Sequence, residues 1–391
     1  MSNPFDEPFH PRNSLAALLG SSPPSNPLTG SAASDLLGSP PPSNPLSQLA
    51  GVSALFGSLA PSPFQSTGSA ASDLLGLWNE PYRPRSEWNN RFAHWESSES
   101  DAETQRIERA RNMVQQALGK NRWLNSEGAR IVPQGSFTNR TNTRLDADID
   151  LRVQHPSIKI EYGYGVNVVT AYQQGGYYDT GVSYAYTSDR MRAEIRSEMI
   201  AAFGALAVDD SGNKAIRVKG LEGSRSEVDV VPCFTLHHIT GQTFLGQTTA
   251  QGTAIFSKDK ANWTLNYPDQ HSENGRTKRL NTGLQFKRVV RIVKRLRADM
   301  TERGILRDSV PSFMVECLVY LVEDRYFTDP SDDRYGRVSR VLNRLAEILA
   351  NPLIAYTSCE INGVKLLFAG GQAWTLDTAR NFVNLAVSHI R

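Results

Sequence analysis

The stretch that decides the fold is PQGSFTNRTNTRLDADIDLRV, residues 133–153. It begins in a short β-branched run at residues 130–134 and ends in a run of alternating polar and apolar residues. Successive side chains of a strand point to opposite faces, so Asp148 and Asp150 share one face while the apolar residues beside them face the core. Two neighbouring carboxylates repel each other, and Mg²⁺ relieves that repulsion because it takes hard oxygen ligands and leaves positions for water and phosphate.

A third acidic residue, Asp229, stands alone among apolar residues in EVDVVP, residues 227–232. The pattern predicts another strand with Asp229 on its outward face. Pairing of the two strands would bring it beside Asp148 and Asp150, and three such carboxylates are typical of a site for two divalent ions about 3.5–4 Å apart. Asp146 lies on the same face one pleat earlier, and its position nearer the loop favours a solvated residue over a ligand.

Gly135 and Ser136 follow the first strand directly, and Ser136 precedes Asp148 by 12 positions (148 − 136). A glycine lets the backbone approach a phosphate closely, and the serine hydroxyl with the following N–H groups can bind phosphate oxygens. Gly-Ser and Asp-x-Asp are each common by chance. Their order on successive strands, with a later solitary aspartate, favours a metal- and phosphate-binding site over a chance match.

The first 84 residues differ in composition from the rest of the chain. Only two residues between positions 13 and 79 are charged, and GSAASDLLG occurs at both 30–38 and 68–76. A second repeat, PPSNPL, has a different offset, so no fixed period indicates a solenoid. Such a segment cannot bury enough surface to offset its ordering entropy, and we expect residues 1–84 to be a disordered tail. The alternative is that its SDLLG turns are docking peptides.

The whole chain has 391 residues, a formal net charge of +2 and three scattered cysteines. A nearly neutral charge indicates neither an obligatory nucleic-acid partner nor a membrane surface. No window is apolar enough for a membrane span, and no secretory signal begins the sequence. Three cysteines are too few for a disulfide scaffold, so we expect a protein of the reducing cytoplasm.

Hydrophobic periodicity predicts the elements of the remaining chain. Helices are expected at residues 101–118, 191–206, 282–300, 311–325, 337–350 and 376–390. Strands are expected at residues 130–134, 147–153, 214–219 and 227–232, with an irregular stretch before the helix at 282–300. This order predicts an α+β fold with two lobes. We place a catalytic lobe at residues 85–240 and a helical lobe at 241–391.

Two further groups of residues have plain structural interpretations. Lys287, Arg291 and Lys294 form a basic stripe at helical spacing, and such a stripe taken alone favours a solvated helix face. Cys233 and the pair His237–His238 have a spacing that fits no common zinc site, so we interpret them as structural.

The combined pattern resembles the DNA polymerase β-like nucleotidyltransferase superfamily, whose signature is Gly-Ser followed about a dozen residues later by Asp-x-Asp. Residues 133–153 are more narrowly similar to the bacterial cyclic GMP–AMP synthase-like enzymes, the CD-NTases, which make second-messenger oligonucleotides in antiphage (CBASS) defence. Similar stretches follow in the family's order: EVDVVPCF (227–234), KDKANWTLNYPDQHSENG (258–275), FKRVVRIVKRLR (286–297) and VPSFMVECLVY (310–320). The N-terminal tail has no counterpart in the family pattern.

The resemblance implies a bilobed polymerase β-like core, with a mixed sheet and helices, and a C-terminal helical lobe. It implies that Asp148 and Asp150 hold two Mg²⁺ or Mn²⁺ ions and that Asp229 completes the metal site on the acceptor side. The residues implied for donor-nucleotide binding are Gly135, Ser136, Lys287, Ser312 and, stacked on the base, Phe313.

The implied activity is synthesis of a cyclic di- or trinucleotide from ATP and from GTP, CTP or UTP, with release of pyrophosphate. The implied partners are a downstream effector reached through the diffusible product and an unidentified activator, with no membrane and no obligatory nucleic acid. Two alternatives stay open. One is a nucleotidyltransferase that makes linear oligonucleotides or modifies a nucleic-acid or protein hydroxyl. The other is a non-catalytic nucleotide- or nucleic-acid-binding protein.

Overall fold

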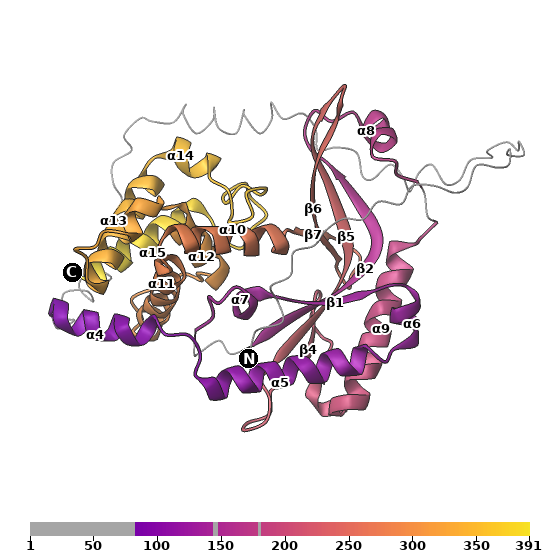
Figure 1. Ribbon diagram of the computed structural model, residues 1–391, viewed down its shortest axis with the longest axis horizontal. Helices are drawn as coiled ribbons and strands as arrows, with labels where there is room; N and C mark the ends of the chain where they lie inside the picture. Colours follow the sequence, from indigo (N-terminus) through magenta and orange to yellow (C-terminus); the bar gives the residue numbers. More distant parts are fainter. Residues whose placement is uncertain (1–82, 144–147, 179–180) are drawn as a thin grey trace, which may run out of the picture. The chain divides into compact units, whose positions relative to one another are not determined.

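The computed structural model describes residues 83–143, 148–178 and 181–391, all of which belong to one compact unit. The expected tail at residues 1–84 lies outside the described residues except for its last two positions, and Asp146 lies outside them as well. The described chain forms a mixed sheet with helices on one face and a separate group of helices near the C-terminus (Figure 1). This confirms the predicted α+β class.

The sheet is built around two long neighbouring strands. Its order is β1 (Arg130–Gln134), β2 (Ile149–Tyr162), β5 (Val228–Thr243), β4 (Ile216–Val218) and β3 (Val208–Asp209). The later part of β5 also pairs with β6 (Gly246–Phe256), which in turn pairs with β7 (Trp263–Asn266). β2 and β5 run parallel, whereas the other described strand pairs are antiparallel.

One face of this sheet is covered by α5 (Asp101–Leu118) and α9 (Tyr184–Phe203). Ile149 and Leu151 of β2 are fully buried there against the apolar stripes of both helices. A capping box of Ser100 and Glu103 fixes the start of α5, because each satisfies a backbone N–H of the other. Since strand side chains alternate, the residues between the buried ones lie on the opposite face of the sheet.

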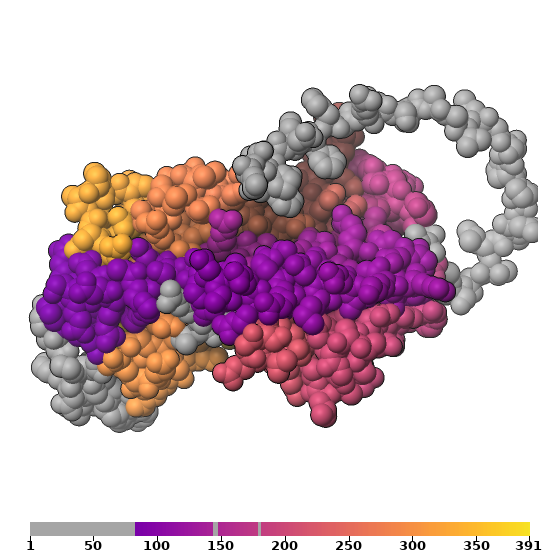
Figure 2. Space-filling model, turned by 60° about the horizontal axis from the view of Figure 1, so that its bottom comes forward, coloured from indigo at the N-terminus to yellow at the C-terminus, as the bar shows by residue number. Residues whose placement is uncertain are grey.

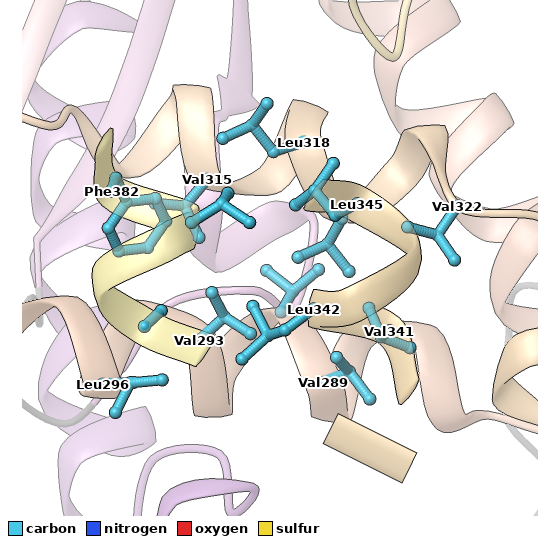
Figure 3. Packing of buried hydrophobic residues seen from close by; sticks show 14 of the residues in the cluster. Val289, Val293, Leu296, Val315, Leu318, Val322, Val341, Leu342, Leu345 and Phe382 are labelled. Atoms are coloured by element: carbon cyan, nitrogen blue, oxygen red, sulfur yellow. The ribbon is translucent and has the colours of Figure 1, made fainter. Parts of the chain in front are cut away.

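The C-terminal helices have a core of their own. They are α10 (Pro268–Asn281), α11 (Gln285–Glu302), α12 (Ser312–Leu321), α13 (Arg334–Ala350), α14 (Pro352–Thr357) and α15 (Leu376–His389). Val293 of α11, Leu345 of α13 and Phe382 of α15 all belong to this core (Figure 3). Helix α4 (Arg85–Trp95), which precedes the sheet in sequence, packs into the same core through Trp88 and Phe92.

Helices α4 and α5 lie along one face of the described chain, the first beside the C-terminal helices and the second beside the sheet (Figure 2). The expected lobe boundary at residues 240/241 falls inside β5, and β6 and β7 continue the same sheet to residue 266. We therefore propose a different division: residues 101–266 form the sheet lobe, and α4 with residues 268–391 forms the helical lobe.

Two predicted elements, α5 and β1, have the predicted bounds. The strands β2 and β5 end at residues 162 and 243 rather than at the predicted 153 and 232, and α9 begins at residue 184 rather than 191. The other predicted helices and strands shift by a few residues. The expectation of irregular structure after residue 232 was wrong. Residues 228–256 form the β5–β6 hairpin, in which threonines and other β-branched residues suit a strand despite the many glycines. The short helices α6 (Arg122–Ser126) and α8 (Val168–Gln174) were not predicted. Among the described helices, none has the length and hydropathy needed to cross a bilayer.

Candidate active site

The predicted carboxylates come together on the sheet face opposite α5 and α9. β2 and β5 pair in parallel with Asp150 directly opposite Asp229. Asp148 immediately precedes β2 and is exposed, whereas Asp150 and Asp229 are partly buried between fully buried neighbours. The expectation that a neighbouring strand would bring Asp229 beside Asp148 and Asp150 is therefore met by the strand register.

The electrostatics of Asp150 are those of a crowded acidic group. Burial first, and then the nearby charges of Asp148 and Asp229, raise the pKa of Asp150 to about 7. An ordinary aspartate has a pKa near 4, so the folded chain holds this carboxyl where its ionised form is disfavoured. A bound cation would remove that penalty.

Asp229 has a cationic neighbour on the next strand. Arg217 of β4 lies opposite it in the register, and the Arg217 guanidinium donates from Nε to Asp229 Oδ1 at 3.1 Å. The same nitrogen lies 3.1 Å from a carboxylate oxygen of Glu227. Asp229 is thus partly neutralised by an arginine, while Asp150 has two acidic neighbours.

The donor types fit Mg²⁺ or Mn²⁺, because carboxylate oxygens on adjacent strands are the hard ligands that these ions take. As the side chains are placed, the described residues contain no group of three acidic, histidine or cysteine side chains arranged to hold a metal ion. The Arg217 contact keeps the carboxylate of Asp229 engaged with β4. The oxygen ligands and the strand register fit the ion. On binding it, the Asp229 carboxylate would release Arg217 and contact the ion instead.

A glycine is required at position 135 because the backbone there passes close to the Asp150 carboxylate. Gly135 follows β1 directly, begins the short helix α7 (Gly135–Thr138) and has a φ of +79°. A Cβ atom at this position would lie 1.9 Å from Oδ2 of Asp150. Any side chain here would displace the Asp150 carboxylate, so Gly135 lies against the acidic site and Ser136 follows it in α7.

The basic stripe of α11 is buried, so its interpretation as a solvated helix face was wrong. Arg291 donates 2.7 Å hydrogen bonds to the carbonyl oxygens of Glu96 and Arg140. Lys294, which is 2% exposed, donates to the Thr141 carbonyl at 2.9 Å and forms an ion pair with Glu316. These two cations attach the helical lobe to the segment between Gly135–Ser136 and β2.

Lys287 differs from its two neighbours in the stripe. It is 7% exposed, and within the described part of the chain its amine has no hydrogen-bond or ion-pair partner. Burial first, and then the charge of Arg279, lower the pKa of Lys287 to about 8, although the charge of Glu316 opposes them. An anionic ligand would stabilise the charged form of this buried amine.

Ser312 and Phe313 begin helix α12, one residue later than expected, with Pro311 at the N-cap position. Phe313 is 37% exposed and is not core packing. Its ring stacks on His271 of α10, with centroids 5.5 Å apart, and lies 6.0 Å from the ring of Trp374. An aromatic face is therefore available on the helical lobe.

The structural interpretation of the cysteine–histidine group agrees with the contacts. His237 and His238 lie on β5, where their Nδ1 atoms are 2.9 Å from the Tyr177 hydroxyl and 2.6 Å from the Tyr267 hydroxyl. Burial raises the pKa of the Cys233 thiol to about 12, which keeps it protonated. These side chains are engaged in the sheet.

Sequence reasoning missed four residues that border the site: Arg140, Thr141, His271 and Glu316. Arg140 has a φ of +55°, a conformation that a non-glycine residue adopts at a cost. Thr141, His271 and Glu316 are buried polar residues joined in one network. Only the polar residue within the apolar run of α12 (SFMVECLVYL) was a signal that could have pointed to Glu316.

The fold and the carboxylate register define a nucleotidyltransferase of the polymerase β type. Residues 273–391 match the family described as the cGAS/DncV-like nucleotidyltransferase C-terminal helical domain. The chain is 30% identical over 312 residues to the cyclic dipyrimidine nucleotide synthase CdnE of Legionella pneumophila, covering 78% of this chain and 98% of that protein. It is 27% identical over 271 residues to the cyclic UMP-AMP synthase of Rhodothermus marinus, covering 69% and 87%.

Solved structures agree with these sequence similarities. The CdnE cyclic dinucleotide synthase of Elizabethkingia meningoseptica, solved with GTP and Apcpp, is similar with a TM-score of 0.59 and 26% identity, covering 76% of this chain and 96% of that one. The CdnE c-UMP-AMP synthase of Rhodothermus marinus, solved with Apcpp and Upnpp, has a TM-score of 0.62 at 24% identity, covering 76% and 94%. The chain belongs to the bacterial cGAS/DncV-like nucleotidyltransferase (CD-NTase) family and is an enzyme of that family.

Proposed function

We propose that this enzyme joins nucleoside triphosphates into a cyclic di- or trinucleotide, with release of pyrophosphate, as a second messenger in bacterial antiphage defence. The observation that carries the proposal is the parallel register that sets Asp150 opposite Asp229, with Gly135 in contact with Asp150. Relatives named as cyclic nucleotide synthases, aligned over nearly their whole length, support the cyclic product.

The carboxylates would hold two divalent ions. Asp148 and Asp150 would contribute to both, and Asp229 would complete the site on the side of the attacking hydroxyl. The ions supply charge neutralisation at the triphosphate and activation of a ribose hydroxyl. The raised pKa of Asp150 supports this assignment, because holding three carboxylates close together in the folded chain is unfavourable without a cation.

The chain's own cationic groups bind and orient the donor. Gly135 lies against Asp150, and Gly135 with the following Ser136 would contact the phosphates through backbone N–H groups and the serine hydroxyl. Lys287 would neutralise the triphosphate, and Ser312 would add a hydroxyl at the start of α12. Phe313 would stack on the donor base through its exposed face. Positioning and neutralisation of this kind supply most of the acceleration in phosphoryl transfer.

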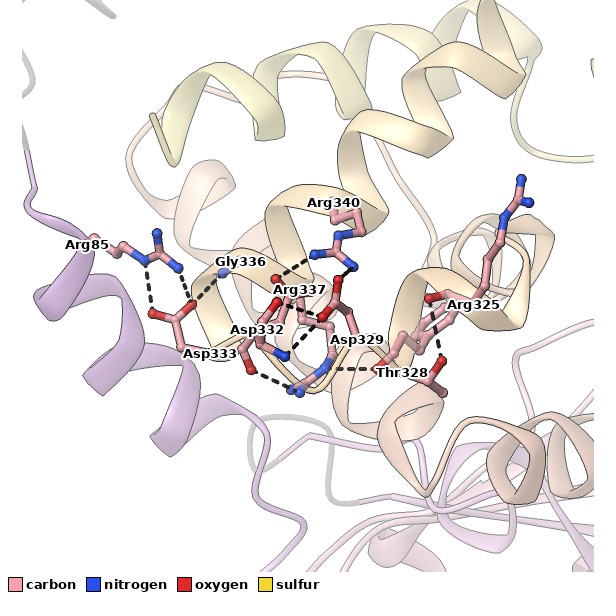
Figure 4. A network of polar contacts seen from close by, with 11 residues as sticks. Arg85, Arg325, Thr328, Asp329, Asp332, Asp333, Gly336, Arg337 and Arg340 are labelled. Carbon is pink, nitrogen blue, oxygen red and sulfur yellow. Dashed lines mark hydrogen bonds and ion pairs between the residues drawn. The ribbon is translucent and has the colours of Figure 1, made fainter.

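We infer that nucleic acid is not an obligatory activator through the arginine-rich helix α13. Arg340 forms ion pairs with Asp329 and Asp332 at 2.7 and 2.8 Å (Figure 4). Arg344 is bonded to Glu323 at 2.6 Å. Arginines already neutralised by carboxylates of their own lobe add little field for a polyanion. An activator of another kind and a downstream effector reached by the diffusible product complete the proposal, which places the reaction in the cytoplasm.

The test is a pyrophosphate-release assay with each of the four nucleoside triphosphates alone and with all four mixed, in Mg²⁺ or Mn²⁺. Products are treated with phosphatase, separated and identified by mass spectrometry, with Asp148→Ala as the inactive control. A phosphatase-resistant species of cyclic mass is the expected result, and it also identifies the bases. Phosphatase-sensitive products would replace the proposal with a synthase of linear oligonucleotides.

A further inference from the structure

We propose that Glu316 is a positioning residue that connects the phosphate-binding turn to the base-stacking ring, so that one buried carboxylate sets the separation between the two ends of a bound nucleotide. The inference rests on the proposed function, because it takes Ser136 as the phosphate contact and Phe313 as the base contact. It adds a residue that touches neither end of the nucleotide itself.

On the phosphate side, Glu316 acts through Thr141. Oε1 of Glu316 accepts a 2.7 Å hydrogen bond from the Thr141 hydroxyl. The backbone N–H of Thr141 donates to the Ser136 carbonyl at 2.9 Å, and the Thr141 carbonyl accepts from Lys294 at 2.9 Å. Thr141 is thus held by its hydroxyl, its amide and its carbonyl. A shift of Glu316 would be passed directly to the turn that carries Ser136.

On the base side, Glu316 acts through His271. Oε2 of Glu316 lies 3.3 Å from Nε2 of His271. A carboxylate can only accept, so Nε2 carries the proton of this contact and the plane of the imidazole is fixed. That imidazole stacks on Phe313 at 29° between ring planes. Glu316 therefore orients the ring on which Phe313 rests.

The network is buried and charged, which makes it sensitive to the loss of any member. Glu316 is 4% exposed and Lys294 is 2% exposed. Burial alone would raise the pKa of Glu316, but the charge of Lys294 and the hydrogen bond of His271 outweigh it and lower that pKa to about 2. A purely structural contact could be made by apolar side chains at no greater cost. The Glu316 network instead joins three helices of the helical lobe to the turn of the sheet lobe that carries Ser136.

The test is a double-variant cycle on nucleotide binding. Thr141→Val removes the hydroxyl that bonds to Glu316, and His271→Phe keeps an aromatic ring against Phe313 but removes the N–H that bonds to Glu316. Binding of each of the four α,β-methylene nucleoside triphosphates is measured by calorimetry with Mg²⁺. We expect each single variant to bind about tenfold more weakly. The double variant should also lose about tenfold rather than hundredfold, because both changes sever the same connection.

Each other result has a definite meaning. Losses that multiply to about a hundredfold would show two independent contacts and would overturn the inference, as would single variants that bind like the wild type. A wild-type protein that binds none of the four analogues would overturn the proposed function, and the inference with it. Additive losses in a protein that does bind overturn the inference alone.

Two further variants separate positioning from stability. Thr282→Val removes another buried hydroxyl of the helical lobe, one that bonds to the Lys278 carbonyl at 2.8 Å, and should lower the melting temperature without weakening nucleotide binding. Glu316→Gln combined with Lys294→Met removes both buried charges together, so neither is left unpaired. Its binding loss should equal that of the double variant. Binding equal to the wild type in a folded protein would contradict the proposal.

Discussion

Two clusters of aspartates in this chain have opposite electrostatic surroundings, which shift the carboxyl pKa in opposite directions. In the helical lobe, hydrogen bonds from the Ser331 hydroxyl and N–H and from Arg340 lower the pKa of the Asp329 carboxyl. Hydrogen bonds led by that from Arg85 lower the pKa of Asp333 (Figure 4). On the sheet, Asp150 has Asp148 and Asp229 as neighbours, and its pKa is raised to about 7.

The difference distinguishes acidic residues that stabilise the fold from acidic residues that are available to bind a ligand. Carboxylates that stabilise the fold are given cationic or N–H partners in the same chain. The ionised carboxylate of Asp150 instead raises the free energy of the folded state. We interpret such a group as a binding site for a cation that the chain itself does not supply. The same contrast separates Lys278, which is paired with Asp324, from Lys287, which has no hydrogen-bond or ion-pair partner among the described residues.

The largest expected effect comes from the sheet aspartates. Asp148→Ala or Asp150→Ala should lower turnover by about 10³-fold or more, because each removes a proposed ligand of the divalent ions that neutralise the reacting phosphates. The folded state should be no less stable at neutral pH, since one repulsive charge is removed. Pyrophosphate release and thermal melts measure the two quantities. Asp329→Asn is the matched control, and it should retain turnover.

If Asp150→Ala unfolded the protein while Asp329→Asn did not, the sheet cluster rather than the helical cluster would be the one that stabilises the fold. Asp150 would then be a structural acid. A variant that is folded and still releases pyrophosphate at the wild-type rate would remove the sheet aspartates from the catalytic mechanism.

Two of the buried lysines of the helical lobe, Lys287 and Lys278, give the next largest effect. Lys287→Met should raise the KM for nucleoside triphosphate by about 10²-fold, because it removes the buried amine that we propose neutralises the triphosphate. Lys278 is bonded to the Val322 carbonyl at 2.7 Å and to Asp324 at 2.8 Å. Lys278→Met should therefore lower the melting temperature and leave KM unchanged. The opposite assignment of the two effects would show that Lys287 is the structural lysine.

The sequence predicted the acidic site well because that site depends on local patterns. Alternation along β2 and β5 sets which side of the sheet each aspartate occupies, and the class of fold followed from the order of elements. Gly135 was predicted to lie near a phosphate, and its contact with Asp150 explains why only glycine fits.

What the sequence did not reveal depends on contacts between distant segments. Lys294 reads as a solvated residue because helical spacing says nothing about which face a second lobe will cover. Its partners, Thr141 and Glu316, are 153 and 22 positions away. Likewise, α4 was not predicted, and its place in the helical core is set by Trp88 and Phe92 meeting helices 200 residues later in the chain.

Acid pH should destabilise the helical lobe through Glu316. The pKa of Glu316 in the folded chain is about 2, below the ordinary value of 4.5. A depressed carboxyl pKa contributes stability that is present above pH 4.5 and is lost as the pH falls towards 2. On the order of 2 kcal/mol should be lost over this range, measured by urea unfolding. The variant with Glu316→Gln and Lys294→Met should lack this part of the pH dependence; an unchanged acid profile would contradict the assignment.

The smallest expected effect concerns Asp333, which caps α13. Its carboxylate accepts from the Gly336 N–H at 2.7 Å and from Arg85 of α4 at 2.9 Å. Asp333→Ala should cost about 1 kcal/mol of unfolding free energy, whereas Asp333→Asn should cost less, because asparagine can still cap the helix. Nucleotide turnover should not change in either variant. Equal losses for alanine and asparagine would assign the stability to the charge on Arg85 rather than to the cap, and any loss of turnover would show that the satisfied cluster also serves the reaction.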